Sequence, residues 1–210
     1  KVLTAKRERL SREKIVRVAT ELMDERGYHG MNLEDVAKRL DVTRPALYYY
    51  YSRKEQLLLA IHNNAQSHLV EAAFEISEKK LGPLETLYSL IHSHATIATN
   101  HSQIVAVMFE EEHNLDPNER EKIRKVRTGY NQRVIDVFQQ AQELGYLIDD
   151  FDPKLAVFLV LGACNWIARW YKPGKWKPED VANSAAHIVL RGLLTEEGVL
   201  ALSEIRIAES

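Results

Sequence analysis

A chain of 210 residues is long enough for one large helical domain, or for a small domain joined to a larger one. Its composition, 45% hydrophobic and 28% charged, supplies both a core and a polar surface. It contains no apolar run long enough to span a bilayer, and residues 1–14 are too charged for a secretory signal. We therefore expect no membrane association and a cytoplasmic location. The single cysteine, Cys164, cannot form an internal disulfide, and we expect it to pack as a small hydrophobic residue.

The net charge of −2 is unevenly distributed along the chain. Residues 1–54 hold 13 Lys and Arg against 8 Asp and Glu, a net charge of +5. Residues 55–210 hold 15 against 22, a net charge of −7. A basic module attracts phosphate groups and an acidic body repels them, so the N-terminal quarter is the candidate for contact with nucleic acid.

Helix signals mark the N-terminal quarter. Ser11 can cap a first helix, and Gly27 ends it because glycine adopts the left-handed conformation at low cost. Asn32 can cap a short second helix. Thr43 can cap a short third helix, with Pro45 tolerated in its first turn.

The remainder of the chain is also punctuated as helices. Ser52 and Glu55 are spaced as a capping box that opens a fourth, longer helix. Further breaks and starts lie at Gly82-Pro83, Asp116-Pro117, Gly145, Asp152-Pro153 and Pro173-Gly174, and a last long helix covers residues 178–194. Because the sequence has no alternating strand pattern, we expect an all-α fold of about nine helices. We place a helix-turn-helix domain at residues 1–54, and a helical domain for ligand binding and dimerisation at residues 55–210.

Residues 32–55 carry the functional signal. Two short helices, each too short to be stable alone, must pack on the first helix, and such a pair lets its second helix enter a major groove of DNA. Four consecutive tyrosines, Tyr48 to Tyr51, disfavour an ordinary helical hairpin, because at most two can be buried on one side. Arg44 can donate to a guanine, and Lys54 at a helix N-terminus can bind a phosphate. The predicted DNA-binding residues are Asn32, Thr43, Arg44, Pro45, Tyr48, Tyr49 and Lys54.

The stretches Gly27-Tyr28, Leu33-Glu34-Asp35-Val36-Ala37 and 42–57 resemble the DNA-binding domain of the TetR family of repressors. Two positions depart from the family pattern: Met31-Asn32 replaces the usual Thr-Thr pair, and Tyr51 replaces Phe. The resemblance implies a homodimer whose recognition helices enter successive major grooves of a palindromic operator, about 34–36 Å apart. It also implies that the protein is a repressor, released when a small molecule enters the C-terminal domain.

A second resemblance lies near the C-terminus. The segment Arg169-Trp170-Tyr171-Lys172-Pro173-Gly174 is similar to a TetR branch that regulates fatty-acid, steroid or aromatic-acid catabolism and responds to coenzyme A thioesters. Lys175 stands where that branch usually has a second glycine. The resemblance implies that helices 153–171 and 178–194 form the dimer interface. The alternative to a thioester-related role for the Arg-Trp-Tyr triplet is that it caps this interface.

An acyl-CoA effector requires an apolar tunnel for its tail, and cations or amide donors for its phosphates. The candidate phosphate partners are Arg127, Arg133 and Arg169. The acidic run 110–112 disfavours phosphate binding unless its side chains face away from the ligand. Plain core packing is the alternative role for each tunnel candidate. The predicted ligand-binding residues are Ile91, Val105, Met108, Phe109, Arg127, Tyr130, Val134, Phe158 and Trp166.

Two further function classes stay open. A metal-responsive regulator could use His92, His94, His101 and His113 near the acidic run, although His92 and His94 point about 200° apart on a helix. A helical scaffold that does not bind DNA is the other. The sequence has no glycine-rich phosphate loop, nucleophile motif or zinc-protease motif, so we expect neither an enzyme nor a cofactor.

Overall fold

The computed structural model describes the backbone of residues 10–208 and the side chains of residues 10–204. Residues 1–9, which include most of the charged N-terminal segment, lie outside the described residues. The described part contains ten α-helices, one 3-10 helix and no strand, which confirms the all-α prediction. The helices are α1 Arg12–Gly30, α2 Leu33–Leu40, α3 Arg44–Tyr50, α4 Lys54–Glu78, α5 Pro83–Asn100, α6 Ser102–Glu111, η1 Glu112–Asn114, α7 Pro117–Glu143, α8 Pro153–Trp170, α9 Pro178–Arg191 and α10 Glu196–Ala208.

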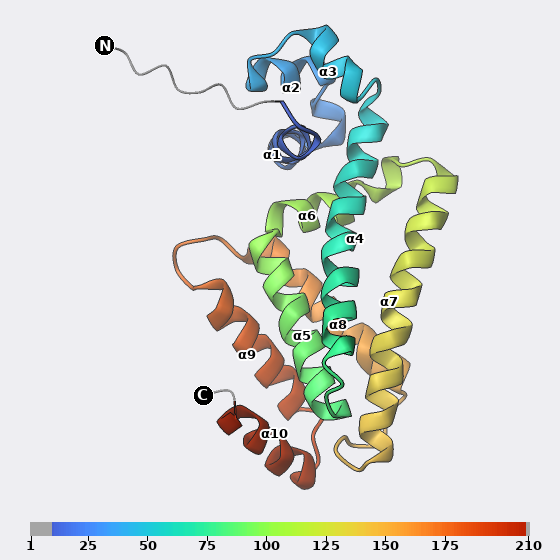
Figure 1. Ribbon diagram of the computed structural model, residues 1–210, viewed down its shortest axis with the longest axis vertical. Helices are drawn as coiled ribbons and strands as arrows, with labels where there is room; N and C mark the ends of the chain where they lie inside the picture. The colour runs from blue at the N-terminus through green and yellow to red at the C-terminus, as the bar shows by residue number, and fades with distance from the viewer. Residues whose placement is uncertain (1–9, 209–210) are drawn as a thin grey trace.

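The helices form a small head and a larger body (Figure 1). Helices α1, α2 and α3 make the head, and α4 runs from the head along the body. Helices α5 and α7 pack beside the lower part of α4, α8 and α9 pack on α5, and α10 closes the far end. Helix α6 lies across the body beneath α1 and contacts it, so the connection between head and body passes through α4 and α6.

Local capping explains where the head helices begin. The Ser11 hydroxyl accepts from the N–H of Lys14 at the start of α1, as predicted. Asn32 and Asp35 form a reciprocal capping box at the start of α2, with N–O distances of 2.9 and 3.0 Å. Gly27 has φ 71° and interrupts the regular part of α1, which confirms the predicted helix end there although a further turn continues to Gly30.

The predicted capping box of Ser52 and Glu55 is wrong in both residues, because α4 begins one residue later, with Arg53 at its N-cap. Gln56, not Glu55, accepts hydrogen bonds from the N–H groups of Ser52 and Arg53, at 2.9 and 3.2 Å. Glu55 instead accepts from the hydroxyl of Tyr28, at 3.1 Å. The spacing alone could not show which of Glu55 and Gln56 closes the box, because Tyr28 of α1 binds the Glu55 carboxylate.

The count of about nine helices missed α10. The sequence does contain a start signal for this helix, a threonine followed by two glutamates in the first turn. In the structure the Thr195 hydroxyl accepts from the N–H of Gly198 at 3.1 Å. The helix then packs against the backbone of Tyr146. A Cβ atom at Gly198 would overlap the Tyr146 carbonyl oxygen, so only glycine permits this approach.

Two hydrophobic cores meet along α4. The head core includes Leu47, Leu57, Leu58 and Ile61, each fully buried, and extends into α6 and α7. The body core gathers residues of α4, α5, α7, α8, α9 and α10 around Phe138. Because the first two turns of α4 pack into the head, the core of the head extends beyond the boundary predicted after residue 54. No helix in the described part is both long and apolar enough to cross a membrane.

Candidate functional site

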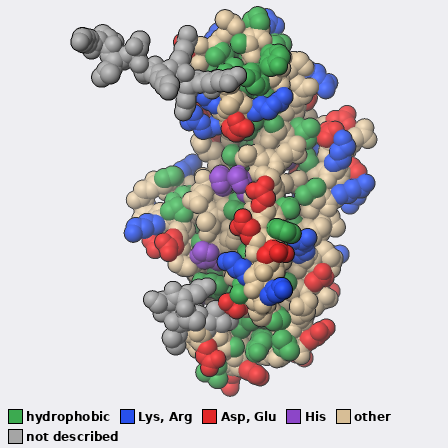
Figure 2. Space-filling model, in the orientation of Figure 1, with side chains coloured by type: hydrophobic (Ala, Val, Ile, Leu, Met, Phe, Trp, Pro, Cys, Tyr) green, Lys and Arg blue, Asp and Glu red, His purple; other side chains and the backbone are tan. Residues whose placement is uncertain are grey.

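Helix α3 presents part of its surface to solvent at the tip of the head, where Figure 2 shows a group of hydrophobic side chains. Leu47 is fully buried and Tyr51 is 6% exposed, so these two side chains anchor the helix. Tyr50 is half-buried, and its hydroxyl donates to the carbonyl of Leu10 at 3.1 Å. Tyr49 is 85% exposed, and its ring meets the Tyr50 ring edge-to-face, with centroids 5.4 Å apart. Tyrosine is common at binding surfaces, because its ring is apolar and its hydroxyl is polar, so Tyr49 is available to contact a partner.

Beside Tyr49, a polar cluster joins α3 to α2. The Arg44 guanidinium lies 3.0 Å from a carboxylate oxygen of Glu34, and the Tyr48 hydroxyl donates to the same oxygen at 3.2 Å. Arg44 also lies over the Tyr48 ring, 4.9 Å from its centroid. The Arg44 side chain remains 65% exposed, so an incoming phosphate or base edge can replace the carboxylate.

The other predicted DNA-binding residues have structural roles. The side chains of Asn32 and Thr43 cap α2 and α3, and Pro45 occupies the exposed first turn of α3. Lys54 differs from expectation: its ammonium donates to the carbonyls of Tyr28 and Met31, at 2.7 and 3.0 Å. It also lies 4.2 Å from the centroid of the Tyr28 ring. Its charge is therefore directed into the head, because α4 begins directly under the corner between α1 and α2.

Tyr28 is the residue on which head and body meet. Its N–H donates to the carboxylate of Glu111 at 2.9 Å, from the end of α6. Its hydroxyl donates to Glu55 at 3.1 Å, from the start of α4. Burial, followed by the hydrogen bond to Glu55, raises the pKa of Tyr28 to about 12, so the hydroxyl stays protonated as a donor.

The acidic run at the end of α6 binds three different helices. Glu110 pairs with Arg169 of α8, Glu111 holds Tyr28 of α1, and Glu112 pairs with Arg127 of α7. The last pair is bidentate, with N–O distances of 2.7 and 3.3 Å. The run therefore ties α1, α7 and α8 together at the junction between head and body, with Glu111 and Glu112 partly buried and Glu110 exposed. We call residues 110–112 the acidic junction.

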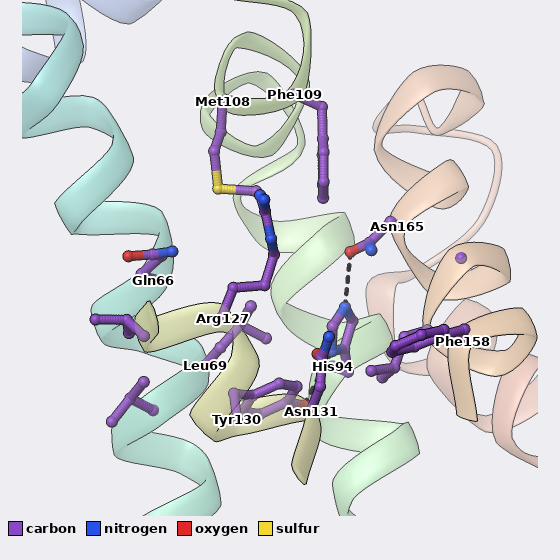
Figure 3. Close-up of a pocket in the computed structure, with 14 residues that line it drawn as sticks. Gln66, Leu69, His94, Met108, Phe109, Arg127, Tyr130, Asn131, Phe158 and Asn165 are labelled. Atoms are coloured by element: carbon purple, nitrogen blue, oxygen red, sulfur yellow. Dashed lines mark hydrogen bonds between the residues drawn. The ribbon is translucent and has the colours of Figure 1, made fainter. Parts of the chain in front are cut away.

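A cavity of about 200 Å³ lies directly below the acidic junction, among α4, α6, α7 and α8 (Figure 3). Met108 and Phe109 of α6 form one wall, and Leu69 of α4 and Phe158 of α8 form others. Phe109 and Phe158 are 42% and 46% exposed, so they lie at the mouth. The lining residues are Gln66, Leu69, Val70, His94, Met108, Phe109, Val126, Arg127, Tyr130, Asn131, Phe158, Leu161, Gly162 and Asn165.

A hydrogen-bonded relay crosses the floor of this cavity. The His94 imidazole contacts the Tyr130 hydroxyl through Nδ1 at 2.9 Å and the Asn165 Oδ1 through Nε2 at 2.8 Å. The amide oxygen can only accept, so Nε2 carries the proton and Nδ1 accepts from Tyr130. Burial lowers the pKa of His94 and raises the pKa of Tyr130, so both side chains are neutral near pH 7. Figure 3 shows the bond between His94 and Asn165.

The structure brings five of the predicted ligand-binding residues to the cavity: Met108, Phe109, Arg127, Tyr130 and Phe158. Ile91, Val105 and Val134 are not among the lining residues; each is at most 5% exposed and packs in a helix interface. Trp166 is 62% exposed and lies outside the cavity, and so do Arg133 and Arg169.

The sequence reasoning missed the polar lining of the cavity. His94 was considered only as a metal ligand, and Asn165 was overlooked within the apolar helix α8. A signal was available, because each is a polar residue inside an apolar helical stretch that core packing alone does not require. The other missed lining residues are Gln66, Leu69, Val70, Val126, Asn131, Leu161 and Gly162.

The four histidines considered for a metal site lie in different surroundings. His92 stacks on Tyr88, His101 stacks on His68, and His113 lies beside Asn114. Within the described residues, no group of three or more potential ligands is placed to hold an ion. A different histidine is unusual: His62 is fully buried on α4, and neither ring nitrogen has a hydrogen-bond partner. Burial lowers the pKa of His62 to about 4.

The outer face of α8 and α9 is apolar and exposed. Ile188 of α9 is 72% exposed, and Leu159 of α8 is 68% exposed. An apolar surface of this kind on adjacent helices is typical of a protein–protein contact. The further large hydrophobic residues exposed on α8 and the loop after it are Leu155, Phe158, Trp166, Trp170 and Trp176.

Two family models match the chain. One, described as "Bacterial regulatory proteins, tetR family", covers residues 15–61. The other, described as "Tetracyclin repressor-like, C-terminal domain", covers residues 80–193.

A curated relative, the fatty acid metabolism regulator protein of Bacillus subtilis (strain 168), is 23% identical over 183 residues, which are 85% of this chain and 93% of the relative. The tetracycline repressor protein class C of Escherichia coli is 40% identical over 53 residues, which are 25% of this chain and 24% of the relative.

Solved structures share the whole architecture. The ketosteroid transcriptional regulator KstR2 of Mycobacterium tuberculosis superimposes with a TM-score of 0.82 at 23% identity, covering 90% of this chain and 98% of that one. AibR, solved in complex with isovaleryl coenzyme A and operator DNA, superimposes with a TM-score of 0.74 at 28% identity, covering 84% and 96%. The matching proteins are transcriptional regulators and not enzymes. This chain, with its helix-turn-helix head and helical body, belongs to the TetR family of bacterial transcriptional regulators.

Proposed function

We propose that this protein is a repressor that binds a palindromic operator as a homodimer and leaves it when an acyl-CoA thioester enters the cavity of the body. Helix α3 enters the major groove, with Tyr49 and Arg44 at its exposed surface. The apolar face of α8 and α9 pairs with a second copy of the chain, which sets the separation of the two heads. Binding to chromosomal DNA places its action in the cytoplasm.

The acidic junction is the observation that carries the release mechanism. Arg127 lines the cavity and pairs with Glu112, while the preceding residue, Glu111, holds the N–H of Tyr28 in the head. A ligand that displaces Arg127 or the adjacent side chains of α6 moves the end of α6. Because Glu111 is adjacent to Glu112, the displacement also moves Tyr28 and the head. The separation of the two recognition helices in the dimer then changes.

The comparisons support this choice of effector. AibR was solved with isovaleryl coenzyme A, and the relative from Bacillus subtilis regulates fatty acid metabolism. Both cover most of this chain. A thioester has an apolar acyl end, which suits the apolar walls of the cavity, and a polar coenzyme end, which the open mouth leaves outside.

The experiment selects bound duplexes from random DNA and then titrates thioesters against the complex. We expect an inverted repeat, a steep salt dependence of affinity, and release by at least one thioester at saturation. Selection of no repeated sequence would favour the helical-scaffold alternative. Binding that no thioester reverses would leave the DNA-binding part of the proposal and remove the effector.

A further inference from the structure

We infer that the cavity below the acidic junction binds a compact, uncharged acyl group whose carbonyl oxygen accepts a hydrogen bond from Asn165. This inference rests on the proposed function, and it narrows the effector to short-chain or single-ring acyl compounds in ester or thioester form. It excludes free carboxylic acids and long-chain acyl groups as the preferred occupants of the cavity.

The volume of the cavity limits the size of the group. An apolar protein cavity of about 150 Å³ holds a benzene molecule. At about 200 Å³, this cavity has room for six to nine non-hydrogen atoms, roughly a five-carbon branched chain or a benzoyl group. The lining residues Leu161 and Tyr130 are 6% and 8% exposed, so core side chains close the inner wall of the cavity. A sixteen-carbon chain is therefore too long for this cavity to enclose.

The charge balance of the cavity excludes a free carboxylate. Arg127 is the one permanent cation among the described lining residues, and Glu112 neutralises it with two hydrogen bonds. His94 is neutral, because both of its ring nitrogens are engaged and burial lowers its pKa. A carboxylate entering this site would lose its hydration without gaining a free cation, which is unfavourable.

The relay nevertheless leaves one donor for a neutral carbonyl. Asn165 uses its Oδ1 to accept from His94, and no described residue accepts from its Nδ2 group. That group belongs to a half-buried side chain at the cavity, held in position by His94, which in turn is bonded to Tyr130. An amide donor among mostly apolar walls discriminates for compounds with a carbonyl at that place, because a ligand without one leaves the donor unpaired.

The first test measures binding of defined probes to the full chain by calorimetry. The thioester probes are pentanoyl-, benzoyl- and hexadecanoyl-CoA, and the small probes are methyl benzoate and benzoate. We expect pentanoyl- or benzoyl-CoA to bind at least tenfold more tightly than hexadecanoyl-CoA, and methyl benzoate at least tenfold more tightly than benzoate. Preference for hexadecanoyl-CoA, or for benzoate, overturns the inference.

The same probes separate the inference from the proposed function. If methyl benzoate binds and no thioester does, the acyl-CoA effector is wrong and the inference stands. If hexadecanoyl-CoA binds best and releases the operator, the proposed function stands and the inference is wrong. If neither esters nor thioesters bind, both are wrong.

The second test assigns the carbonyl contact. Asn165→Leu removes the donor, and Asn165→Asp keeps the oxygen that accepts from His94 while also removing the donor. We expect both variants to lose at least fivefold in affinity for benzoyl-CoA. Asn63→Leu, which changes an exposed amide on α4 outside the cavity, should lose less than twofold. Thermal melting of each free variant confirms that it is folded, and unchanged affinity in the folded Asn165→Asp variant overturns the assignment.

Discussion

A carboxylate oxygen of Glu111 accepts the backbone N–H of Tyr28 at 2.9 Å, and so joins two residues that lie 83 positions apart in the chain. Tyr28 is 5% exposed, so its N–H has no ready access to water. Replacing Glu111 by Ala leaves a buried donor without a partner. We expect the free energy of unfolding, measured in urea, to fall by about 1–3 kcal/mol.

The matched control for that change is Glu111→Gln. Its side-chain oxygen still accepts from Tyr28, so it should lose less than half as much stability as Glu111→Ala. Because the head is positioned through this bond, Glu111→Ala should also weaken operator binding measured by fluorescence anisotropy. Equal stability of wild type and Glu111→Ala would show that another group satisfies the Tyr28 N–H.

Tyr49 is 85% exposed at the tip of α3, and its removal disturbs no buried contact. We expect Tyr49→Ala to weaken operator binding by about tenfold, since loss of a good contact to DNA costs roughly 1–3 kcal/mol. Its melting temperature should match that of the wild type. Phe74→Ala, which removes a 56% exposed aromatic side chain from α4, should change neither quantity. Unaltered operator affinity in Tyr49→Ala would place the DNA contact elsewhere.

Lys54 donates charged hydrogen bonds to two carbonyls of the head. We expect Lys54→Met, which keeps most of the apolar stem, to lower the free energy of unfolding by about 2 kcal/mol. The free energy of unfolding separates a structural role of Lys54 from a role in phosphate binding. A phosphate-binding lysine would instead leave stability unchanged and reduce the slope of operator affinity against salt by about one unit.

His62 makes stability depend on pH. Its pKa is about 4 in the folded protein, below the ordinary value of 6.5, because burial opposes the charged form. Between these values the unfolded state binds more protons, so the free energy of unfolding falls as the pH drops from 6.5 to 4. The contribution is fully present above pH 6.5, and about 3 kcal/mol is lost by pH 4.

His62→Leu tests this contribution because leucine has a similar volume and no unpaired nitrogen. We expect its free energy of unfolding at pH 7 to equal or exceed that of the wild type. The difference between variant and wild type should then grow as the pH falls to 4, whatever the other titrating groups contribute. A difference that stays constant over this range would contradict the assigned pKa.

Ile188 is 72% exposed on the apolar face of α8 and α9. We expect Ile188→Glu to convert the proposed dimer to a monomer in analytical ultracentrifugation, because the charge would be buried without a partner. The monomer should lose most of its operator affinity, since two heads no longer bind together. Phe74→Glu adds the same charge on α4 and should leave the assembly unchanged.

The amino-acid sequence is sufficient to predict the helices of the head and the family. Ser11, Asn32 and Thr43 each cap a helix by bonding to a backbone group three residues away. Contacts this short depend on the local order of residues, so spacing is sufficient to predict them. The exposed position of Tyr49 was likewise predictable, because a run of four tyrosines cannot be buried on one side of a helix.

Which inward-facing residues line the cavity could not be predicted from the sequence. Tyr130 and Val134 lie one turn apart on the same face of α7, yet only Tyr130 reaches the cavity. The relay joins His94 to residues 36 and 71 positions away, and Lys54 bonds to carbonyls 26 and 23 positions away. Helical periodicity shows that a side chain faces inward, but its partner depends on how separate helices pack. That packing is fixed by the sum of many contacts across the chain and not by any local pattern.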